Sequence, residues 1–172
     1  MQALYTFLLI VIFSTGSIHA FAACNPDINI AKTNNLYTDN NDGTVTDKTT
    51  NLMWQKCTFG QTGNDCGTGT ALIYTWQAAL AIANVNTNNS YTNWRLPNKN
   101  ELDSLLEDAC NAPSINSAIF PSTVSSIIAE YWSASPYSGN NTSAWVVNFN
   151  NGAVYNTDKS NSRYLRLVRD IQ

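Results

Sequence analysis

The stretch Trp94-Arg95-Leu96-Pro97-Asn98, followed by Glu101-Leu102, leads from a strand into a helix. Pro97 ends the strand, because proline has no amide hydrogen to donate to a sheet. Asn98 is a favoured N-cap residue, and Glu101 stands three positions later, which is the spacing of a capping box. Apolar residues then recur at i, i+3, i+4 and i+7, namely Leu102, Leu105, Leu106 and Ala109. The pattern predicts a helix that buries this face and turns Asp103 and Glu107 toward solvent.

Upstream of this stretch, the sequence predicts a hairpin, a third strand and another helix. Tyr37-Thr38 and Thr44-Val45-Thr46 flank Asn41-Asp42-Gly43, where Asp-Gly supplies the positive φ angles of a tight turn. Leu52-Met53-Trp54 reads as the next strand. Thr75 is the expected N-cap of an alanine-rich helix that ends near Asn84.

Downstream, the last third of the chain is predicted to be β. Between Ala144 and Phe149, alternation places Trp145, Val147 and Phe149 toward the core and Ala144, Val146 and Asn148 toward solvent. Asn151-Gly152 is a hairpin signal, and a last strand is expected from Arg163 to Arg169. Two helices followed by antiparallel strands indicate a single α+β domain over residues 23–172.

Composition excludes several classes of function. The 172 residues are 44% hydrophobic, enough for a core, but only 12% charged, with a formal net charge of −3. This acidic balance argues against nucleic-acid binding, which needs clustered Lys and Arg. The only histidine is His19, within an N-terminal leader, so the remaining chain has no imidazole for catalysis or metal ligation. We therefore expect no enzymatic activity, no metal and no cofactor.

Residues 1–22 have the features of a signal peptide. The apolar run from Leu4 to Phe13 is too short to span a bilayer, and Ala20-Phe21-Ala22 offers small residues for cleavage before Ala23. We expect export to the periplasm, the cell surface or the medium, with no transmembrane segment. An uncleaved N-terminal anchor is the alternative, because no Lys or Arg precedes the apolar run.

Four cysteines follow the leader, an even number that suggests two disulfides in an exported protein: Cys24, Cys57, Cys66 and Cys110. Three pairings are open. Turn-forming residues between Cys57 and Cys66 favour a short closed loop, which leaves Cys24 to pair with Cys110. One alternative is lipid attachment at Cys24, which follows a loose lipoprotein-type box. Another is a redox or metal pair at Cys57 and Cys66, although their spacing fits neither motif.

The run Asp39-Asn40-Asn41-Asp42-Gly43 is similar to a calcium loop. With Gly43 at the glycine position of an EF-hand, however, the twelfth residue is Thr49 rather than the bidentate Glu. A plain hairpin turn is the better interpretation, so no metal site is expected here.

Seven groups of segments, in order along the chain, resemble one protein family. They are DGTVTD at 42–47 with TNLMW at 50–54, WQAAL at 76–80, WRLPN at 94–98 with EL at 101–102, IN at 115–116 with FP at 120–121, YWSAS at 131–135, WVVNF at 145–149 with Gly152, and RLVR at 166–169. Together they resemble DUF1566, the family named for the C-terminal domain of the Legionella collagen-like adhesin, over about residues 37–169.

The resemblance implies an exported bacterial domain whose fold is C-type-lectin-like and related to formylglycine-generating enzymes. The family's namesake binds sulfated glycosaminoglycans and mediates attachment. The resemblance thus implies a secreted or surface-exposed, non-catalytic binding module for a glycan or a protein, although an acidic chain is poorly suited to polyanions. One alternative is a structural component of a surface appendage or envelope complex. Another is a formylglycine-type oxidase in which reduced Cys57 and Cys66 bind copper.

The candidate ligand-binding residues are of two kinds. The loop residues Tyr137, Asn140 and Asn141 combine an aromatic ring with amides, the chemistry that binds carbohydrate, although a plain connection is the simpler interpretation. Arg163, Arg166 and Arg169 form the main basic cluster, with Lys159 beside it, suited to structural ion pairs or to an anionic glycan. The residues expected to have structural roles are Trp54, Trp94, Arg95, Glu101, Trp132 and Trp145.

Overall fold

The computed structural model describes residues 22–87 and 91–171. The expected signal peptide, apart from Ala22, lies outside these residues. None of the helices in the two described ranges is long and apolar enough to cross a membrane.

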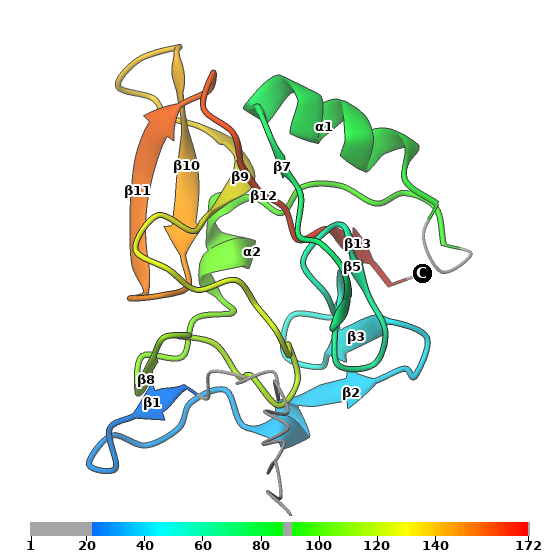
Figure 1. Cartoon of the computed structure of the whole chain (residues 1–172), viewed down its shortest axis with the longest axis vertical. Coiled ribbons are helices and arrows are strands. Elements are labelled where there is room, and N and C mark those ends of the chain that lie inside the picture. Colours follow the sequence, from blue (N-terminus) through cyan, green and yellow to red (C-terminus); the bar gives the residue numbers. More distant parts are fainter. Residues whose placement is uncertain (1–21, 88–90, 172) are drawn as a thin grey trace, which may run out of the picture.

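The largest sheet has five strands in the order β11-β10-β9-β12-β7, and all but β7 come from the second half of the chain (Figure 1). Its strands, in chain order, are β7 (Ile73–Tyr74), β9 (Glu130–Pro136), β10 (Ser143–Asn148), β11 (Ala153–Asp158) and β12 (Arg163–Tyr164). The pairs are antiparallel except β12 with β9, which run parallel. The hairpin predicted at Asn151-Gly152 connects β10 and β11, so that expectation is confirmed.

A second sheet gathers the N-terminal strands and the end of the chain in the order β13-β4-β3-β2. Its strands are β2 (Tyr37–Asp39), β3 (Thr44–Asp47), β4 (Leu52–Gln55) and β13 (Val168–Asp170). The predicted hairpin is present, with Tyr37 opposite Asp47. Two small sheets complete the fold, one pairing β1 (Ala23–Cys24) with β8 (Cys110–Asn111), the other pairing β5 (Gln61–Thr62) with β6 (Thr68–Gly69).

The two α-helices cover opposite faces of the five-stranded sheet. On one face α1 (Trp76–Val85) packs Ala79 and Ala83 into a cluster with Val146. On the other, α2 (Lys99–Asp103) and the turn after it pack Leu102 into a cluster with Val147. Successive residues of β10 therefore point into different cores.

This two-sided cover corrects one prediction about β10. Ala144, Val146 and Asn148 were expected to face solvent, but all three are buried. Alternation identified the two faces of the strand correctly, yet it does not reveal that α1 covers the second one. Trp145, expected in the core, is only half-buried near the beginning of β10.

The helix predicted after Asn98 is much shorter than its apolar pattern suggests. The capping box is present, but α2 ends at Asp103. The chain then unwinds so that Leu106 can bridge to Ile115 and the amide of Glu107 can donate to Ser114. The apolar side chains that defined the predicted face are all buried in spite of this, namely Leu102, Leu105, Leu106 and Ala109.

The expectation that Glu107 faces solvent is wrong. The residue is 1% exposed, and its carboxylate accepts hydrogen bonds from the amides of Lys32, at 2.5 Å, and Ala109, at 3.1 Å. These donors compensate a buried carboxylate, so Glu107 fastens the N-terminal segment to the body of the domain.

The last strand, expected to run from Arg163 to Arg169, is divided between two sheets. Its first part is β12, in the five-stranded sheet, and its last part is β13, in the four-stranded sheet. Between them Leu165 and Leu167 accept backbone hydrogen bonds from Phe59 and Gln55, each at 2.9 Å. The chain thus crosses from one sheet to the other, which links the two halves of the core.

The preferred disulfide pairing is confirmed. Cys57 is bonded to Cys66 and Cys24 to Cys110, and the described residues contain no free cysteine. The second bridge joins the N-terminal strand β1 to β8. Because the sulfur of Cys24 is bonded to Cys110, this structure does not fit the lipid-attachment alternative. The bond between Cys57 and Cys66 does not fit the reduced pair of the copper-binding alternative.

Candidate binding surface

The expected structural residues mostly lie where the sequence places them. Trp54, Trp94 and Trp132 are buried. Arg95 forms a bidentate ion pair with Glu101 at the start of α2, with nitrogen–oxygen distances of 2.8 and 2.9 Å. These residues hold the framework together, and the three tryptophans offer little surface to a ligand.

The loop that connects β9 to β10 is exposed and internally ordered. The side-chain oxygen of Asn140 accepts hydrogen bonds from the amides of Thr142 and Ser143, at 3.1 and 2.8 Å. Asn140 is therefore a turn-forming residue as well as an exposed amide. Asn141 is exposed beside it.

Tyr137 does not extend freely from this loop but packs on Trp145. The two rings meet edge to face, with centroids 5.3 Å apart at an interplanar angle of 82°. Lys99, at the start of α2, places its Nζ 5.0 Å from the centre of the Trp145 ring. A cation over an indole face is a favourable electrostatic contact, so the three side chains form one unit.

A second cation–indole pair lies on the other side of the loop. Lys159 places its Nζ 4.5 Å from the centre of the Trp76 ring and donates a hydrogen bond to the carbonyl of Asn141 at 2.7 Å. The amide of Trp76 donates to the carbonyl of Lys159, and the indole Nε1 donates to Ser133. Lys159 thus ties the loop to the beginning of α1.

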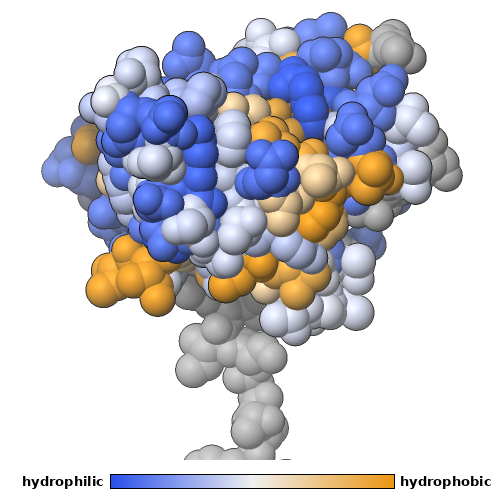
Figure 2. Space-filling view, turned by 90° about the horizontal axis from the view of Figure 1, so that it is seen from above, coloured by the Kyte–Doolittle hydropathy of each residue, from blue (hydrophilic) through white to orange (hydrophobic). Residues whose placement is uncertain are grey.

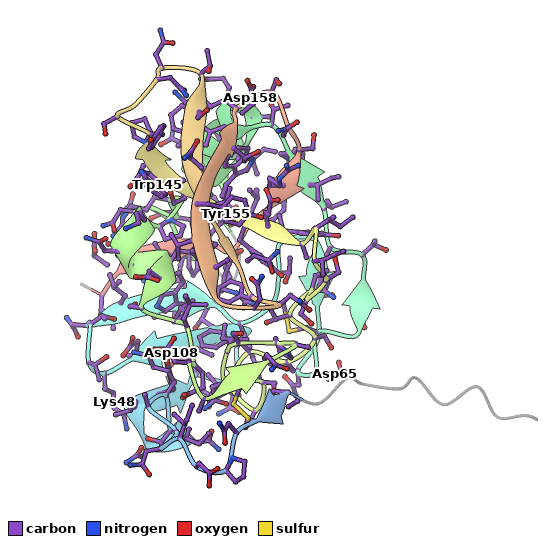
Figure 3. All side chains as sticks on the ribbon, turned by 90° about the vertical axis from the view of Figure 1, so that its left-hand side faces the viewer. Lys48, Asp65, Asp108, Trp145, Tyr155 and Asp158 are labelled. Carbon is purple, nitrogen blue, oxygen red and sulfur yellow. A yellow bond between two sulfur atoms is a disulfide. The ribbon has the colours of Figure 1, made fainter. Side chains whose placement is uncertain are left out.

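We call this region the loop-end surface and define it as loop residues 137–142 with Trp76, Lys99, Trp145 and Lys159. Figure 2 looks onto this end of the molecule, where mostly hydrophilic side chains cover the part formed by β10 and β11. Figure 3 shows Trp145 and Asp158 in the upper part of the domain, with Lys48 near its lower end. The surface combines half-buried indoles, ammonium groups and amides.

Spacing along the chain did not reveal the two cation–indole pairs. Lys99 is 46 positions from Trp145, and Lys159 is 83 positions from Trp76.

The expected basic cluster does not form a common surface. Arg163 is half-buried and pairs through its Nε with Glu130, whose other oxygen accepts the Tyr155 hydroxyl at 2.7 Å. Arg169 is 8% exposed and stacks on Tyr91, with 4.8 Å between the guanidinium carbon and the ring centre. Each arginine is thus engaged within the fold.

Arg166 is entirely buried, so the suggestion that it contacts a ligand is not compatible with its position. Its Nη1 donates to the carbonyls of Gln55 and Lys56, and its Nη2 donates to the Thr123 hydroxyl at 2.8 Å. Burial lowers the pKa of this guanidinium to about 10. The Arg166 side chain lies where the chain passes from one sheet to the other, and it donates hydrogen bonds to carbonyls that water cannot reach.

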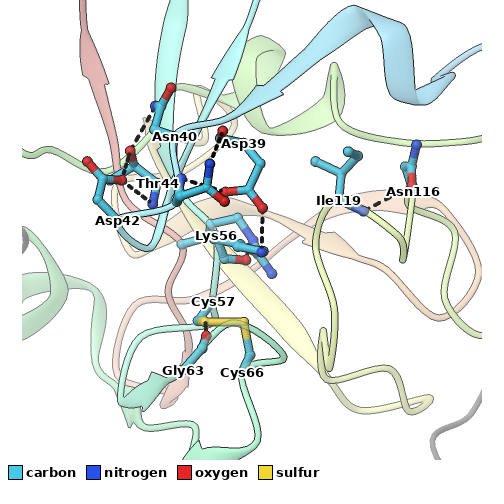
Figure 4. Close-up of polar contacts among 12 residues, drawn as sticks. Asp39, Asn40, Asp42, Thr44, Lys56, Cys57, Gly63, Cys66, Asn116 and Ile119 are labelled. Carbon is cyan, nitrogen blue, oxygen red and sulfur yellow. Dashed lines mark hydrogen bonds and ion pairs between the residues drawn. A yellow bond between two sulfur atoms is a disulfide. The ribbon is translucent and has the colours of Figure 1, made fainter.

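The turn that is similar to a calcium loop is held by protein groups (Figure 4). Asp39 pairs with Lys56 at 2.7 Å, and the Asp42 carboxylate accepts hydrogen bonds from the amide and hydroxyl of Thr44. Within residues 22–87 and 91–171, no three His, Cys, Asp or Glu side chains gather in a way that could hold a metal ion.

The comparison with protein families extends this description. A family model described as the Lcl C-terminal domain matches residues 43–169. The chain belongs to this family. The matched region of this Lcl C-terminal domain begins in the β2–β3 turn and runs into β13, so it covers the five-stranded sheet and the four-stranded sheet apart from β2. Membership indicates a surface-associated, adhesin-like module. A comparison with curated proteins gives no significant match.

Proposed function

We propose that this Lcl C-terminal domain is a surface-exposed, non-catalytic binding module that contacts a glycan through the loop-end surface. The observation that carries the proposal is the pair of half-buried indoles, Trp76 and Trp145, each with a lysine over its ring, on the two sides of an exposed loop. The exposed parts of half-buried indoles offer apolar contact to a sugar ring, and ammonium groups donate to hydroxyl or acidic oxygens.

The location in the fold supports this role. The loop-end surface lies at the tip of the β9–β10 hairpin, where loop residues do not have to fill a core. The body below it is braced by two disulfides, a feature of exported proteins. A rigid scaffold that presents a polar and aromatic loop suits recognition rather than a chemical step.

Retention on immobilised polysaccharides tests the proposal. We would load the disulfide-bonded protein at low salt on heparin and on neutral polysaccharide columns, and compare it with the double variant Lys99→Gln/Lys159→Gln. The matched control is Lys32→Gln/Lys48→Gln, which removes the same two charges outside the loop-end surface, with Lys48 near the opposite end of the domain. We expect the double variant to elute earlier and the control to elute with the parent protein.

The proposal fails if the parent protein is not retained on any polysaccharide at low salt. It also fails if the control reduces retention as much as the double variant does, since binding would then depend on charge in general and not on this surface.

A second candidate function, contact with another protein, is favoured by one observation. Ile127 and Ile128 are adjacent and 80% and 78% exposed in the segment before β9. Neighbouring exposed apolar side chains are typical of protein contact sites. Light scattering over a range of concentrations would test self-association, and a mass that rises for the parent but not for Ile127→Ser/Ile128→Ser would support it.

A further inference from the structure

The five-stranded sheet ends on one side in an open strand. β11 (Ala153–Asp158) pairs with β10 along its whole length, and no strand of the described residues lies on its other side (Figure 1). Figure 3 looks onto this edge, where the ribbon of β11 runs across the front of the view past Tyr155 toward Asp158. Residues 153–157 are all partly exposed. The backbone of β11 is therefore accessible to another chain.

A hydrogen bond just beyond β11 shows which of its residues direct their backbone outward. The amide of Lys159 donates to the carbonyl of Thr142 at 2.8 Å, in the position that follows the last pair of the β10–β11 ladder. Along an antiparallel strand, residues alternate between bonding the partner strand and facing away from it. The N–H and C=O groups of Val154 and Asn156 therefore face away from β10. In the described parts of the chain, no segment other than β10 bonds the backbone of either residue.

This edge lacks the features that usually prevent edge strands from pairing, which are charged side chains, proline, bulges and short length. Residues 153–157 (AVYNT) include no Lys, Arg or Pro, and the register with β10 is regular over the whole strand. The other edge strands of the two large sheets are short, with two residues in β7 and three each in β2 and β13. Among these edges, β11 is thus the longest and the least protected.

Two exposed apolar side chains lie close to the open edge. Ile127 and Ile128 are 80% and 78% exposed, and the Asn148 side chain donates to the carbonyl of Ile127 at 3.1 Å. Asn148 stands opposite Ala153 of β11, so the isoleucine pair is anchored one strand away from the edge. Backbone hydrogen bonds add little net affinity because they replace bonds to water, whereas burial of apolar surface drives association. The two isoleucines supply that apolar surface.

A second copy of this chain fits the edge. Antiparallel pairing of β11 with itself, centred on Asn156, places outward-facing residues opposite each other, with Val154 opposite Asp158 of the second copy. Asp158 is the only charged residue of the strand. Because a strand rises about 3.4 Å per residue, the two Asp158 residues would lie about 14 Å apart, beyond the Debye length of about 8 Å. The two edges therefore meet without strong like-charge repulsion.

We propose that two copies of this domain associate through β11 across a two-fold axis. The two sheets then form one continuous sheet, with Ile127 and Ile128 of both copies on the same face beside the junction. The proposal rests on the second candidate function above, for which it names the partner and the edge, and it does not depend on glycan binding.

Light scattering and NMR-detected amide exchange of the disulfide-bonded protein, from micromolar to millimolar concentration, test the proposal. We expect the mass to rise toward twice that of the monomer. We also expect the amides of Val154 and Asn156 to exchange at least about tenfold more slowly at the high concentration, because pairing protects them. The amide of Asn141, in the exposed β9–β10 loop, is the internal control and should exchange equally at both concentrations.

Two variants separate the contribution of the edge from that of the apolar pair. Asn156→Pro removes an outward amide hydrogen, which an edge strand tolerates, and should keep the protein monomeric; its urea unfolding midpoint verifies the fold. Ile127→Ser/Ile128→Ser should raise the dissociation constant roughly tenfold or more, because apolar burial is lost. The matched control, Leu72→Ser/Val85→Ser, removes two exposed apolar side chains elsewhere and should associate as the parent does.

A parent protein that stays monomeric over the whole range overturns the proposal and leaves the edge to an extended strand of a different protein. Self-association that Asn156→Pro does not weaken, or that leaves the Val154 and Asn156 amides unprotected, also overturns it, although the second candidate function then stands. Polysaccharide retention is measured separately, so a failure of the glycan proposal is distinguishable from both results.

Discussion

Arg95 and Glu101 face each other across the junction between strand and helix, with Nη1 2.8 Å from Oε2 and Nη2 2.9 Å from Oε1. The same carboxylate accepts the Asn98 amide at 2.7 Å, and Arg95 also reaches Asp170 of β13 at 3.1 Å. The Glu101 side chain therefore completes the capping box and also positions Arg95, which contacts the C-terminal strand β13.

Replacing this carboxylate should destabilise the domain. Glu101→Gln removes the charge that pairs with Arg95 and weakens the capping box of α2. Because the Arg95 side chain is 37% exposed, water solvates its guanidinium and compensates part of the lost stability. We expect the free energy of unfolding to fall by about 1–2 kcal/mol in urea titrations. Asp103→Asn, on the same helix, is the control and should change it by less than about 0.5 kcal/mol. If both variants lower the free energy of unfolding equally, the Arg95–Glu101 pair makes no specific contribution to stability.

The ion pair between Asp39 and Lys56 should make stability depend on pH. The hydrogen bond from Lys56 lowers the pKa of the Asp39 carboxyl below its ordinary 3.8. A carboxyl whose folded pKa is lowered stabilises the fold above its unfolded pKa, and this contribution disappears as the pH falls through the folded value. Asp39→Asn should therefore be less stable than the parent at neutral pH and lose less stability on acidification.

Thermal unfolding between neutral pH and about pH 2 measures this difference, because that range covers the titration of an aspartate. The exposed Asp108 offers a matched control, since Asp108→Asn removes the same charge away from Lys56. Parallel pH curves for the parent and Asp39→Asn would contradict the prediction.

The two disulfides should contribute unequally to stability. Cys24–Cys110 joins residues 86 positions apart and Cys57–Cys66 only 9. The loop-entropy model assigns about 4–5 kcal/mol to the long loop and about 2–3 kcal/mol to the short one. Paired replacement by serine, followed by denaturant unfolding, should show the larger loss for Cys24→Ser/Cys110→Ser. The reverse order would mean that local packing around the short loop outweighs chain entropy.

Gly139 should control the position of Tyr137. A Cβ at residue 139 would lie 2.3 Å from a ring carbon of Tyr137, so Gly139→Ala must move that ring away from its place beside Trp145. We expect a changed near-ultraviolet circular dichroism spectrum with little loss of stability, because the loop is exposed. In Gly67→Ala the nearest atom is a carboxylate oxygen of Asp65 at 3.0 Å, and the spectrum should be unchanged. An unaltered spectrum for Gly139→Ala would show that the two rings are not coupled.

Local features of the sequence were sufficient for the short-range elements. The turn at Asp42-Gly43 and the cap at Asn98 depend on hydrogen bonds within a few residues, so residue type and spacing predict them. The disulfide pairing was likewise predictable, because a nine-residue separation with turn-forming residues closes easily. The relation of the fold to C-type lectins stays a prediction.

The candidate site was predictable only in part. The loop that contains Tyr137 was recognised from its composition, and it is indeed exposed. Arg166 was misjudged because its partners, the carbonyls of Gln55 and Lys56, lie about 110 positions away in sequence. Burial of a charged side chain depends on such distant acceptors, and no local pattern records them.

The sequence by itself predicted the two hairpin turns, the helix starts after Thr75 and Asn98, the two faces of β10 and a preferred cysteine pairing, since these depend mainly on local backbone preferences and on side-chain period. Only the tertiary structure decided that α1 and α2 cover both faces of one sheet, that Glu107 and Arg166 are buried, and that Lys99 and Lys159 lie over tryptophans. The physical reason is that burial and cation–indole contacts depend on which surfaces pack together after the chain has crossed between the two sheets. That packing joins residues that are far apart in the sequence.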